Sequence, residues 1–308
     1  MYSRIEISAL KPGDVLLYHY TGWIGRAIRK FDGTDYNHAA LYDDDGDVIE
    51  ALAEGVVKRN IQKSAARSKY ITVFRLKDAP GDMQPVVDVA KSYLGHRYAG
   101  AQLILLAAIC LFRKIKMNRI VARIAETALE KAANLLMSRY GVNSRESLTC
   151  SELVYRSYNE AAGDNYKITV LRESGNVASQ GSERFLYEKG CLFERLYADP
   201  GRTRLYTMPD VPVQPKIRED STCEKLVGQI DDYQEETLNE ATVARLRAAT
   251  VSLLDAVFQT RKKQPGIVVD AVTVYSVLEK YGADFSDFVT PGDLFKSPSL
   301  QPVGDICK

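Results

Sequence analysis

The pattern of apolar and polar positions predicts strands early in the chain and helices later. Four short runs rich in strand-forming residues are bounded by turn residues, and they predict strands over residues 14–20, 38–42, 48–52 and 70–76. Apolar positions at a spacing of three or four predict helices over 23–32, 86–94, 100–139 with a break near 116–118, and 150–162. Strands that cluster before helices favour an α+β fold over regular βαβ repetition.

The second half of the chain predicts helices around an irregular stretch. Residues 164–218 lack a regular pattern, and one or two strands are expected near 192–208. Beyond them, the spacing of apolar residues predicts helices over 219–232, 238–262 and 267–281, followed by a closing loop at 290–294.

Composition narrows the function classes. The chain has 308 residues, 45% of them hydrophobic and 26% charged, and a formal net charge of +1. This balance is ordinary for a globular protein and gives no global attraction to nucleic acid, so no nucleic-acid partner is expected. The five cysteines are widely spaced without metal-binding pairs, so we expect no metal and no cofactor. Residues 1–10 lack the apolar run of a secretory signal; we expect a cytoplasmic protein, with signal-independent secretion as the alternative.

An apolar run over residues 99–112 is shorter than the roughly 20 residues that a membrane span needs. Five basic residues follow it directly, between 113 and 123. An apolar helix with a cationic flank is typical of a membrane-surface contact or a lipid-binding segment. A buried helix with a solvated basic face gives the same pattern, and this second interpretation is favoured.

Cys150 lies where a helix is expected to begin. Thr149 and Glu152 fit a capping box, which places the sulfur in the first helical turn. The unpaired N–H groups and the positive helix dipole there favour a thiolate and can stabilise an oxyanion. The charge of Glu152 opposes the thiolate, so a nearby imidazolium is still needed. A cysteine at a helix start is also commonly no more than a small buried side chain.

His38 is the candidate base, because it begins a predicted strand and the chain has only three histidines. Glu50, on the next strand, is the candidate for the group that orients the imidazole ring. The acidic, glycine-containing segment 43–47 between the two strands predicts a β-hairpin. If this hairpin turns about Asp44, residues 38 and 50 are direct cross-strand partners; if it turns about Asp45, they are diagonal neighbours on one face. A register between these two puts Glu50 on the opposite face.

Four motifs occur in one order along the chain. They are Leu10-Lys11-Pro12-Gly13-Asp14-Val15-Leu16-Leu17, Asn37-His38-Ala39-Ala40-Leu41-Tyr42, Val48-Ile49-Glu50-Ala51 with Gly55-Val56-Val57, and Thr149-Cys150-Ser151-Glu152-Leu153-Val154. Together they resemble the circularly permuted papain-like amidases and peptidases of the YiiX and YaeF type, relatives of the NlpC-type peptidases and of lecithin:retinol acyltransferase. Segments 93–98 and 290–298 also look like parts of that family.

The resemblance implies a thiol hydrolase that attacks an amide or ester carbonyl and forms a covalent acyl-enzyme. Carried over to this chain, Cys150 is the nucleophile, His38 the base and then the acid, and Glu50 the orienting group. The fold expected is α+β, a permuted papain-like, NlpC-like core whose antiparallel sheet packs on the cysteine helix. We expect a core over 1–163 with a helical insertion at 99–144, a mostly helical insertion or subdomain over 164–284, and a C-terminal segment 285–308 that returns to the core.

The sequence leaves the substrate open between a peptide, an isopeptide and an acyl lipid. The relationship to lecithin:retinol acyltransferase, together with the apolar and basic segment 99–123, makes a lipid acyltransferase an alternative. A further alternative, from another class, is a non-catalytic binding or effector module whose helical insertions hold a protein partner.

Overall fold

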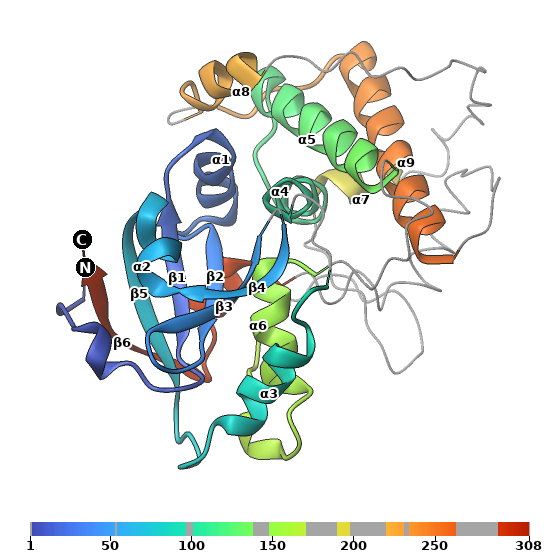
Figure 1. Ribbon diagram of the computed structural model, residues 1–308. Helices are drawn as coiled ribbons and strands as arrows, with labels where there is room; N and C mark the ends of the chain where they lie inside the picture. The colour runs from blue at the N-terminus through green and yellow to red at the C-terminus, as the bar shows by residue number, and fades with distance from the viewer. Residues whose placement is uncertain are drawn as a thin grey trace. The chain divides into compact units, whose positions relative to one another are not determined.

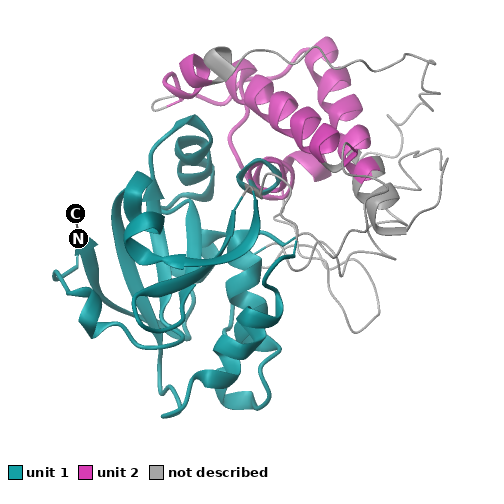
Figure 2. Cartoon of the chain, in the orientation of Figure 1, with its two compact units in different colours: residues 1–105, 145–172, 288–308 teal, residues 106–144, 173–287 magenta. Residues whose placement is uncertain are grey.

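The computed structural model describes residues 2–52, 54–96, 101–137, 148–170, 190–197, 220–230, 234–262 and 289–307. The chain divides into two compact units (Figure 2). One is made of residues 1–105, 145–172 and 288–308, and the other of residues 106–144 and 173–287. The first unit contains the described strands and the cysteine helix, and the second is built from helices in its described part.

An antiparallel sheet of six strands forms the centre of the first unit (Figure 1). Its order is β4-β3-β2-β1-β5-β6, with bounds β1 Val15–Tyr20, β2 His38–Tyr42, β3 Asp47–Leu52, β4 Gly55–Asn60, β5 Ser68–Leu76 and β6 Leu300–Cys307. The four predicted strands are confirmed, and so is the α+β class. β4 and β6 have no counterpart among the predicted strands, because β4 ends in polar residues and β6 contains Pro302 and Gly304, which weaken a strand pattern.

Helices surround this sheet and build the second unit. They are α1 Trp23–Asp32, α2 Ile61–Ser64, α3 Gln84–Ser92, α4 Ala101–Phe112, α5 Arg119–Met137, α6 Cys150–Asn159, α7 Leu192–Tyr197, α8 Asp220–Val227, α9 Glu240–Lys262 and α12 Pro291–Phe295. The predicted break near 116–118 falls between α4 and α5. The predicted stop of the first helix is confirmed too, because Gly33 adopts a left-handed conformation at the end of α1.

One prediction of local structure is wrong, a second is wrong in its described part, and a third lies outside the described residues. In the region 192–208, where one or two strands are predicted, residues 192–197 form helix α7, and their apolar side chains Leu192, Phe193 and Leu196 are buried at helical spacing. Residues 198–208 lie outside the residues that the structure describes. The predicted closing loop contains α12, which begins with a capping box between Thr290 and Asp293. The helix predicted over 267–281 lies outside the residues that the structure describes.

Two hydrophobic clusters cover the two faces of the sheet. Alternate residues of β2 divide between them: Ala39 and Leu41 belong to the cluster that contains Leu153 and Val154 of α6. Ala40 and Tyr42 belong to the cluster that contains Ile61 of α2. α3 and α6 lie side by side on the first face (Figure 1). The sheet is therefore packed on the cysteine helix, as the family resemblance implies.

The apolar run that follows the sheet is a buried helix. The apolar side chains at positions 105–112 of α4 are all buried, as the favoured interpretation of the sequence predicts. Within the described part of the chain, no helix combines the length and the apolar character needed to cross a membrane. Contact of residues 99–123 with a membrane surface stays a prediction.

Gly25 of α1 leaves space for the side chain of Asn37, which binds the backbone at the end of β1. A Cβ at position 25 would lie 2.0 Å from Asn37 Nδ2. Asn37 has little room to move, because Nδ2 donates to Tyr20 O and Oδ1 accepts from Tyr20 N, each at 2.9 Å. We predict that Gly25→Ala destabilises the first unit by about 1–3 kcal/mol, although glycine-to-alanine changes inside helices ordinarily stabilise by about 1 kcal/mol.

Thermal unfolding followed by circular dichroism measures this effect. Gly81→Ala is the matched control, since a Cβ at position 81 meets no atom within 4 Å. A Gly25→Ala protein as stable as the control variant would contradict the role given to the Asn37 contact.

Candidate active site

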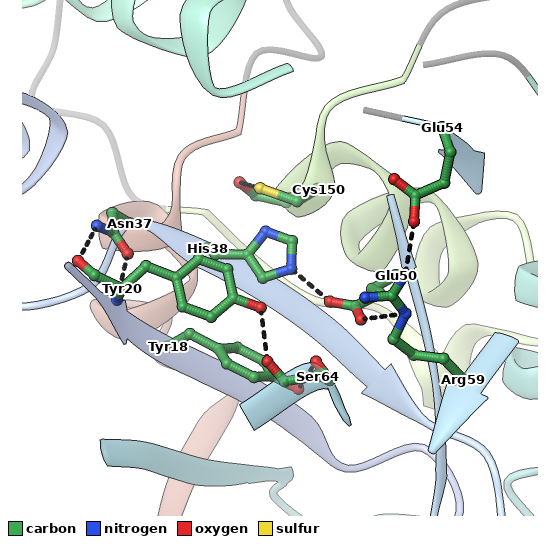
Figure 3. Close-up of polar contacts among 10 residues, drawn as sticks. Tyr18, Tyr20, Asn37, His38, Glu50, Glu54, Arg59, Ser64 and Cys150 are labelled. Carbon is green, nitrogen blue, oxygen red and sulfur yellow. Dashed lines mark hydrogen bonds and ion pairs between the residues drawn. The ribbon is translucent and has the colours of Figure 1, made fainter. Parts of the chain in front are cut away.

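His38 and Glu50 meet across the hairpin of β2 and β3. Ala40 pairs with Glu50, so the hairpin turns about Asp45, and residues 38 and 50 are diagonal neighbours on one face. This is one of the two predicted registers that bring the side chains together. His38 Nε2 lies 2.8 Å from Glu50 Oε2, and the two side chains are 1% and 0% exposed (Figure 3). The pair is therefore a short hydrogen bond shielded from water.

Cys150 is the first residue of α6, at the position that the sequence predicts. Thr149 Oγ1 accepts a hydrogen bond from the N–H of Glu152, and Glu152 Oε2 accepts one from the N–H of Thr149. This reciprocal capping box is the one that the sequence predicts, and it fixes the sulfur at the helix N-terminus. Cys150 Sγ also lies 3.8 Å from Ser151 Oγ.

The sulfur and the imidazole approach each other from different faces of the sheet. The helix that carries Cys150 packs on the face of Ala39, whereas His38 has the parity of Ala40 on the other face. They meet because His38 is the first residue of β2 and so lies at the N-terminal end of the strand. Since Nε2 is bound to Glu50, Nδ1 is the nitrogen left for the thiol, and Figure 3 shows it on the side of Cys150.

Electrostatics at this junction favour a charged pair. Burial alone raises the pKa of the Cys150 thiol, but the His38 charge and hydrogen bonds from His38, Ala39 and Ser151 lower that pKa overall. Burial also disfavours the His38 imidazolium, yet Cys150 and Glu50 together raise the pKa of His38 to about 9. The two shifts have the directions of a thiolate–imidazolium pair.

Two tyrosines hold the imidazole ring from β1. The Tyr20 ring stacks on that of His38 with centroids 4.9 Å apart, and Tyr18 contacts it edge-on at 5.2 Å. Ser64 joins the two tyrosines, because its Oγ donates to Tyr18 Oη and its carbonyl accepts from Tyr20 Oη. Motif reasoning missed these residues, although two aromatics at alternate positions of a strand beside His38 are a usable signal.

Arg59 completes the polar surroundings of Glu50. Its Nε lies 3.6 Å from Glu50 Oε1, and its Nη2 bonds to Glu54 Oε1 at 2.5 Å (Figure 3). Sequence reasoning missed Arg59 because it missed β4. The usable signal is the pairing of β4 with β3, which places Val57 opposite Glu50 and Arg59 two residues further on the same face.

The other two histidines, His19 and His96, contact residues outside the group formed by Cys150, His38 and Glu50. The rings of His19 and Tyr70 are tilted against each other with centroids 4.9 Å apart. The backbone of His96 pairs with Val56, and its ring contacts Tyr93 edge-on. Among the residues that the structure describes, no group of three or more His, Cys, Asp or Glu side chains is placed to hold a metal ion. Cys150 is itself 0% exposed, so a substrate reaches the sulfur only when neighbouring residues move.

Comparisons with known proteins point to one family. Residues 9–102 match the family model described as permuted papain-like amidase enzyme, YaeF/YiiX, C92 family. The predicted resemblance to the permuted papain-like amidases is confirmed. The matched range includes His38 and Glu50, whereas Cys150 lies beyond it. Similarity to these amidases and peptidases supports a hydrolase-type activity.

Two individual proteins are similar to this chain. A probable lipoprotein peptidase, YaeF of Escherichia coli strain K12, is 25% identical over 213 residues, which are 64% of this chain and 77% of that protein. Among solved structures, the metalloprotein YiiX of Escherichia coli O157:H7 aligns over 97% of this chain and 98% of its own, with 13% identity and a TM-score of 0.39.

The lowered pKa of Cys150 predicts an unusual pH dependence of its alkylation. An ordinary thiol with a pKa of about 8.5 is roughly 1% ionised at pH 6.5 and so reacts about 100-fold more slowly there than at its plateau. We expect the rate for Cys150 to fall less than this over the same interval, because more of this thiol is ionised at pH 6.5. Iodoacetamide labelling of the Cys150 peptide, followed by mass spectrometry, measures this profile.

Burial of Cys150 slows its labelling at every pH. The ratio of the labelling rates at two pH values within one protein therefore does not depend on this burial. His38→Ala should shift the profile to that of an ordinary or buried thiol, because the imidazolium is lost. Wild-type labelling that falls about 100-fold towards pH 6.5 would contradict the ion pair.

Proposed function

We propose that the chain is a thiol hydrolase that cleaves an amide or ester bond through Cys150, His38 and Glu50. The observation that carries this proposal is the position of the His38 ring. One of its nitrogens is bound to a buried carboxylate, and the other is left for a cysteine at a helix N-terminus. A nucleophile, a base and an orienting group in this order are the elements that acyl transfer requires.

In the acylation step, the Cys150 thiolate attacks the carbonyl carbon and forms the carbon–sulfur bond. The carbonyl oxygen becomes an oxyanion, which the unpaired N–H groups in the first turn of α6 are positioned to stabilise. His38 then gives its proton to the leaving nitrogen or oxygen as that bond breaks. The products are a thioester on Cys150, a neutral imidazole and the released amine or alcohol.

In the deacylation step, water replaces the leaving group. Neutral His38 accepts a proton from the water as its oxygen attacks the thioester carbonyl, and the carbon–sulfur bond then breaks. This returns the thiolate, the imidazolium and a free carboxylic acid. Glu50 keeps the ring in one orientation through both steps and stabilises the imidazolium whenever it forms.

An amide is the favoured substrate, because the family and the relative named above are an amidase and a peptidase. Acyl transfer to a lipid has less support, because the apolar residues 105–112 that favour it in the sequence are buried in α4. We therefore propose peptide-like substrates, with water as the acyl acceptor.

A generic acyl donor tests the covalent intermediate. With p-nitrophenyl acetate we expect a burst of nitrophenolate equal to the enzyme concentration, an acetyl group on Cys150, and slower release of acetate to water. Cys150→Ser should lose the burst. Cys110→Ala, which removes another buried thiol, should keep it. Equal bursts in wild type and Cys150→Ser would contradict Cys150 as the nucleophile, and transfer to an added lipid alcohol alone would support the acyltransferase instead.

Substitution of Glu50 tests the orienting role. Glu50→Gln keeps the shape of the side chain and an acceptor for His38 Nε2–H, but removes the negative charge. We expect the pKa of His38 to fall and the acylation rate to drop about 10- to 100-fold, with the thermal unfolding temperature close to that of wild type. Stopped-flow measurement of the nitrophenolate burst gives the rate. An unchanged rate in a folded protein would remove Glu50 from the site.

A further inference from the structure

The carboxylate of Glu50 has one oxygen that the triad does not use. Oε2 is bound to His38, whereas Oε1 is buried and accepts no hydrogen bond. The Arg59 guanidinium lies beside Oε1, with Nε at 3.6 Å. A fully buried carboxylate is costly unless charges or hydrogen bonds compensate it, so this second oxygen needs an explanation.

The titratable and charged groups that interact with Glu50 or with its partners come from β1, β2, β4, the β3–β4 connection and α6. They are Tyr18 and Tyr20 on β1, His38 on β2, Glu54 between β3 and β4, Arg59 on β4 and, beyond the imidazole, Cys150 on α6. The tyrosines are neutral at physiological pH, because burial raises the pKa of both hydroxyls. In this set of described residues, Arg59 is the one group whose positive charge does not depend on the catalytic proton.

We propose that Arg59 is a positioning residue that acts through Glu50 and holds this carboxylate in place when His38 is neutral. The proposal rests on the function proposed above. It adds Arg59 as a fourth charged group beside Cys150, His38 and Glu50. Thiolate, imidazolium, carboxylate and guanidinium alternate in sign from Cys150 to Arg59. Each charge is thus stabilised by its neighbours while substrate is absent.

The need for Arg59 is greatest in the acyl-enzyme. At that stage Cys150 carries an acyl group and His38 has given its proton to the leaving group, so both are neutral. Without Arg59, Glu50 would then be a buried carboxylate with no cation beside it, which is costly, and it would turn away from the imidazole. Arg59 supplies the compensating charge, so Glu50 stays ready to receive the imidazolium when His38 activates water.

The geometry of Arg59 suits this task. Its guanidinium is shared: Nε faces Glu50 and Nη2 is bound to Glu54, which is 53% exposed. The outer carboxylate holds the planar group in place, while the inner edge stays beside Oε1. A lysine has one ammonium group and cannot serve both carboxylates with fixed geometry.

The experiment measures iodoacetamide labelling of Cys150 against pH in wild type and Arg59→Met. Without Arg59, Glu50 holds the His38 imidazolium beside Cys150 less firmly, so the thiolate loses stabilisation and less of it forms in acid. We expect the acidic limb of the Arg59→Met profile to move to higher pH by about one unit, which means labelling about tenfold slower below the midpoint. Arg59→Lys should recover part of that shift.

Lys58→Met is the matched control. Lys58 is the neighbour of Arg59 on β4 and is similarly exposed, at 35% against 32%, but its side chain binds Asp43. Asp43 keeps Lys91 as a second partner at 2.8 Å. We expect the Lys58→Met profile to match that of wild type, which separates a local effect at Glu50 from a general change of charge.

A double variant shows whether Arg59 acts through Glu50. In a Glu50→Gln background, Arg59→Met should cause no further shift of the acidic limb. Equal shifts in both backgrounds, or no shift in wild type, would overturn the proposal for Arg59 and leave the triad intact. A wild-type profile that resembles an ordinary thiol would instead remove the proposed function.

Discussion

The arrangement of this site depends on the hydrogen bond between His38 and Glu50, which is closed to water. A buried carboxylate is stable there only with a cationic or hydrogen-bonding partner. A buried imidazole stays protonated there only beside a carboxylate and a thiolate. The turn at Asp45 sets the strand register that places the two side chains on one face. Tyr18, Tyr20 and Ser64 then limit the rotation of the ring.

The cysteine reaches this pair from the opposite side of the sheet. Leu153 and Val154 anchor α6 in the core of the other face, and the capping box at Thr149 fixes where the helix starts. His38 is the first residue of β2. At this N-terminal end of the strand, a side chain on one face of the sheet can meet a helix that packs on the other face. His38 and Glu50 come from one hairpin, and Cys150 comes from a helix later in the chain.

Local signals in the sequence were sufficient for the hairpin and for the capping box. The acidic, glycine-containing turn between two apolar runs predicts β2 and β3, and Thr149 and Glu152 predict the start of α6. The register was not decided by the sequence, because turn centres at Asp44 and at Asp45 both satisfy the same pattern of apolar positions. The structure has the second, with the turn centred on Asp45 and Ala40 opposite Glu50.

Features that depend on pairing between distant segments of the chain cannot be predicted from local signals in the sequence. β4 and β6 are edge strands whose polar, proline or glycine residues hide the alternation, so Arg59 had no predicted neighbour. Residues 192–197 form a helix because three apolar side chains are buried along one side, which the short segment alone does not reveal. The ordered motifs supplied the connection between Cys150 and His38, which are far apart in sequence and carry no local sign of their contact.

The protonation state of His38 tests the central claim most directly. Nitrogen chemical shifts of the imidazole, measured by NMR on protein labelled at its three histidines and assigned with His38→Gln, report that state. We predict an imidazolium at pH 7 that loses its proton near pH 9, and a much lower pKa for His38 in Cys150→Ser, where no thiolate remains. A neutral His38 at pH 7, or the same titration in Cys150→Ser, would contradict the account.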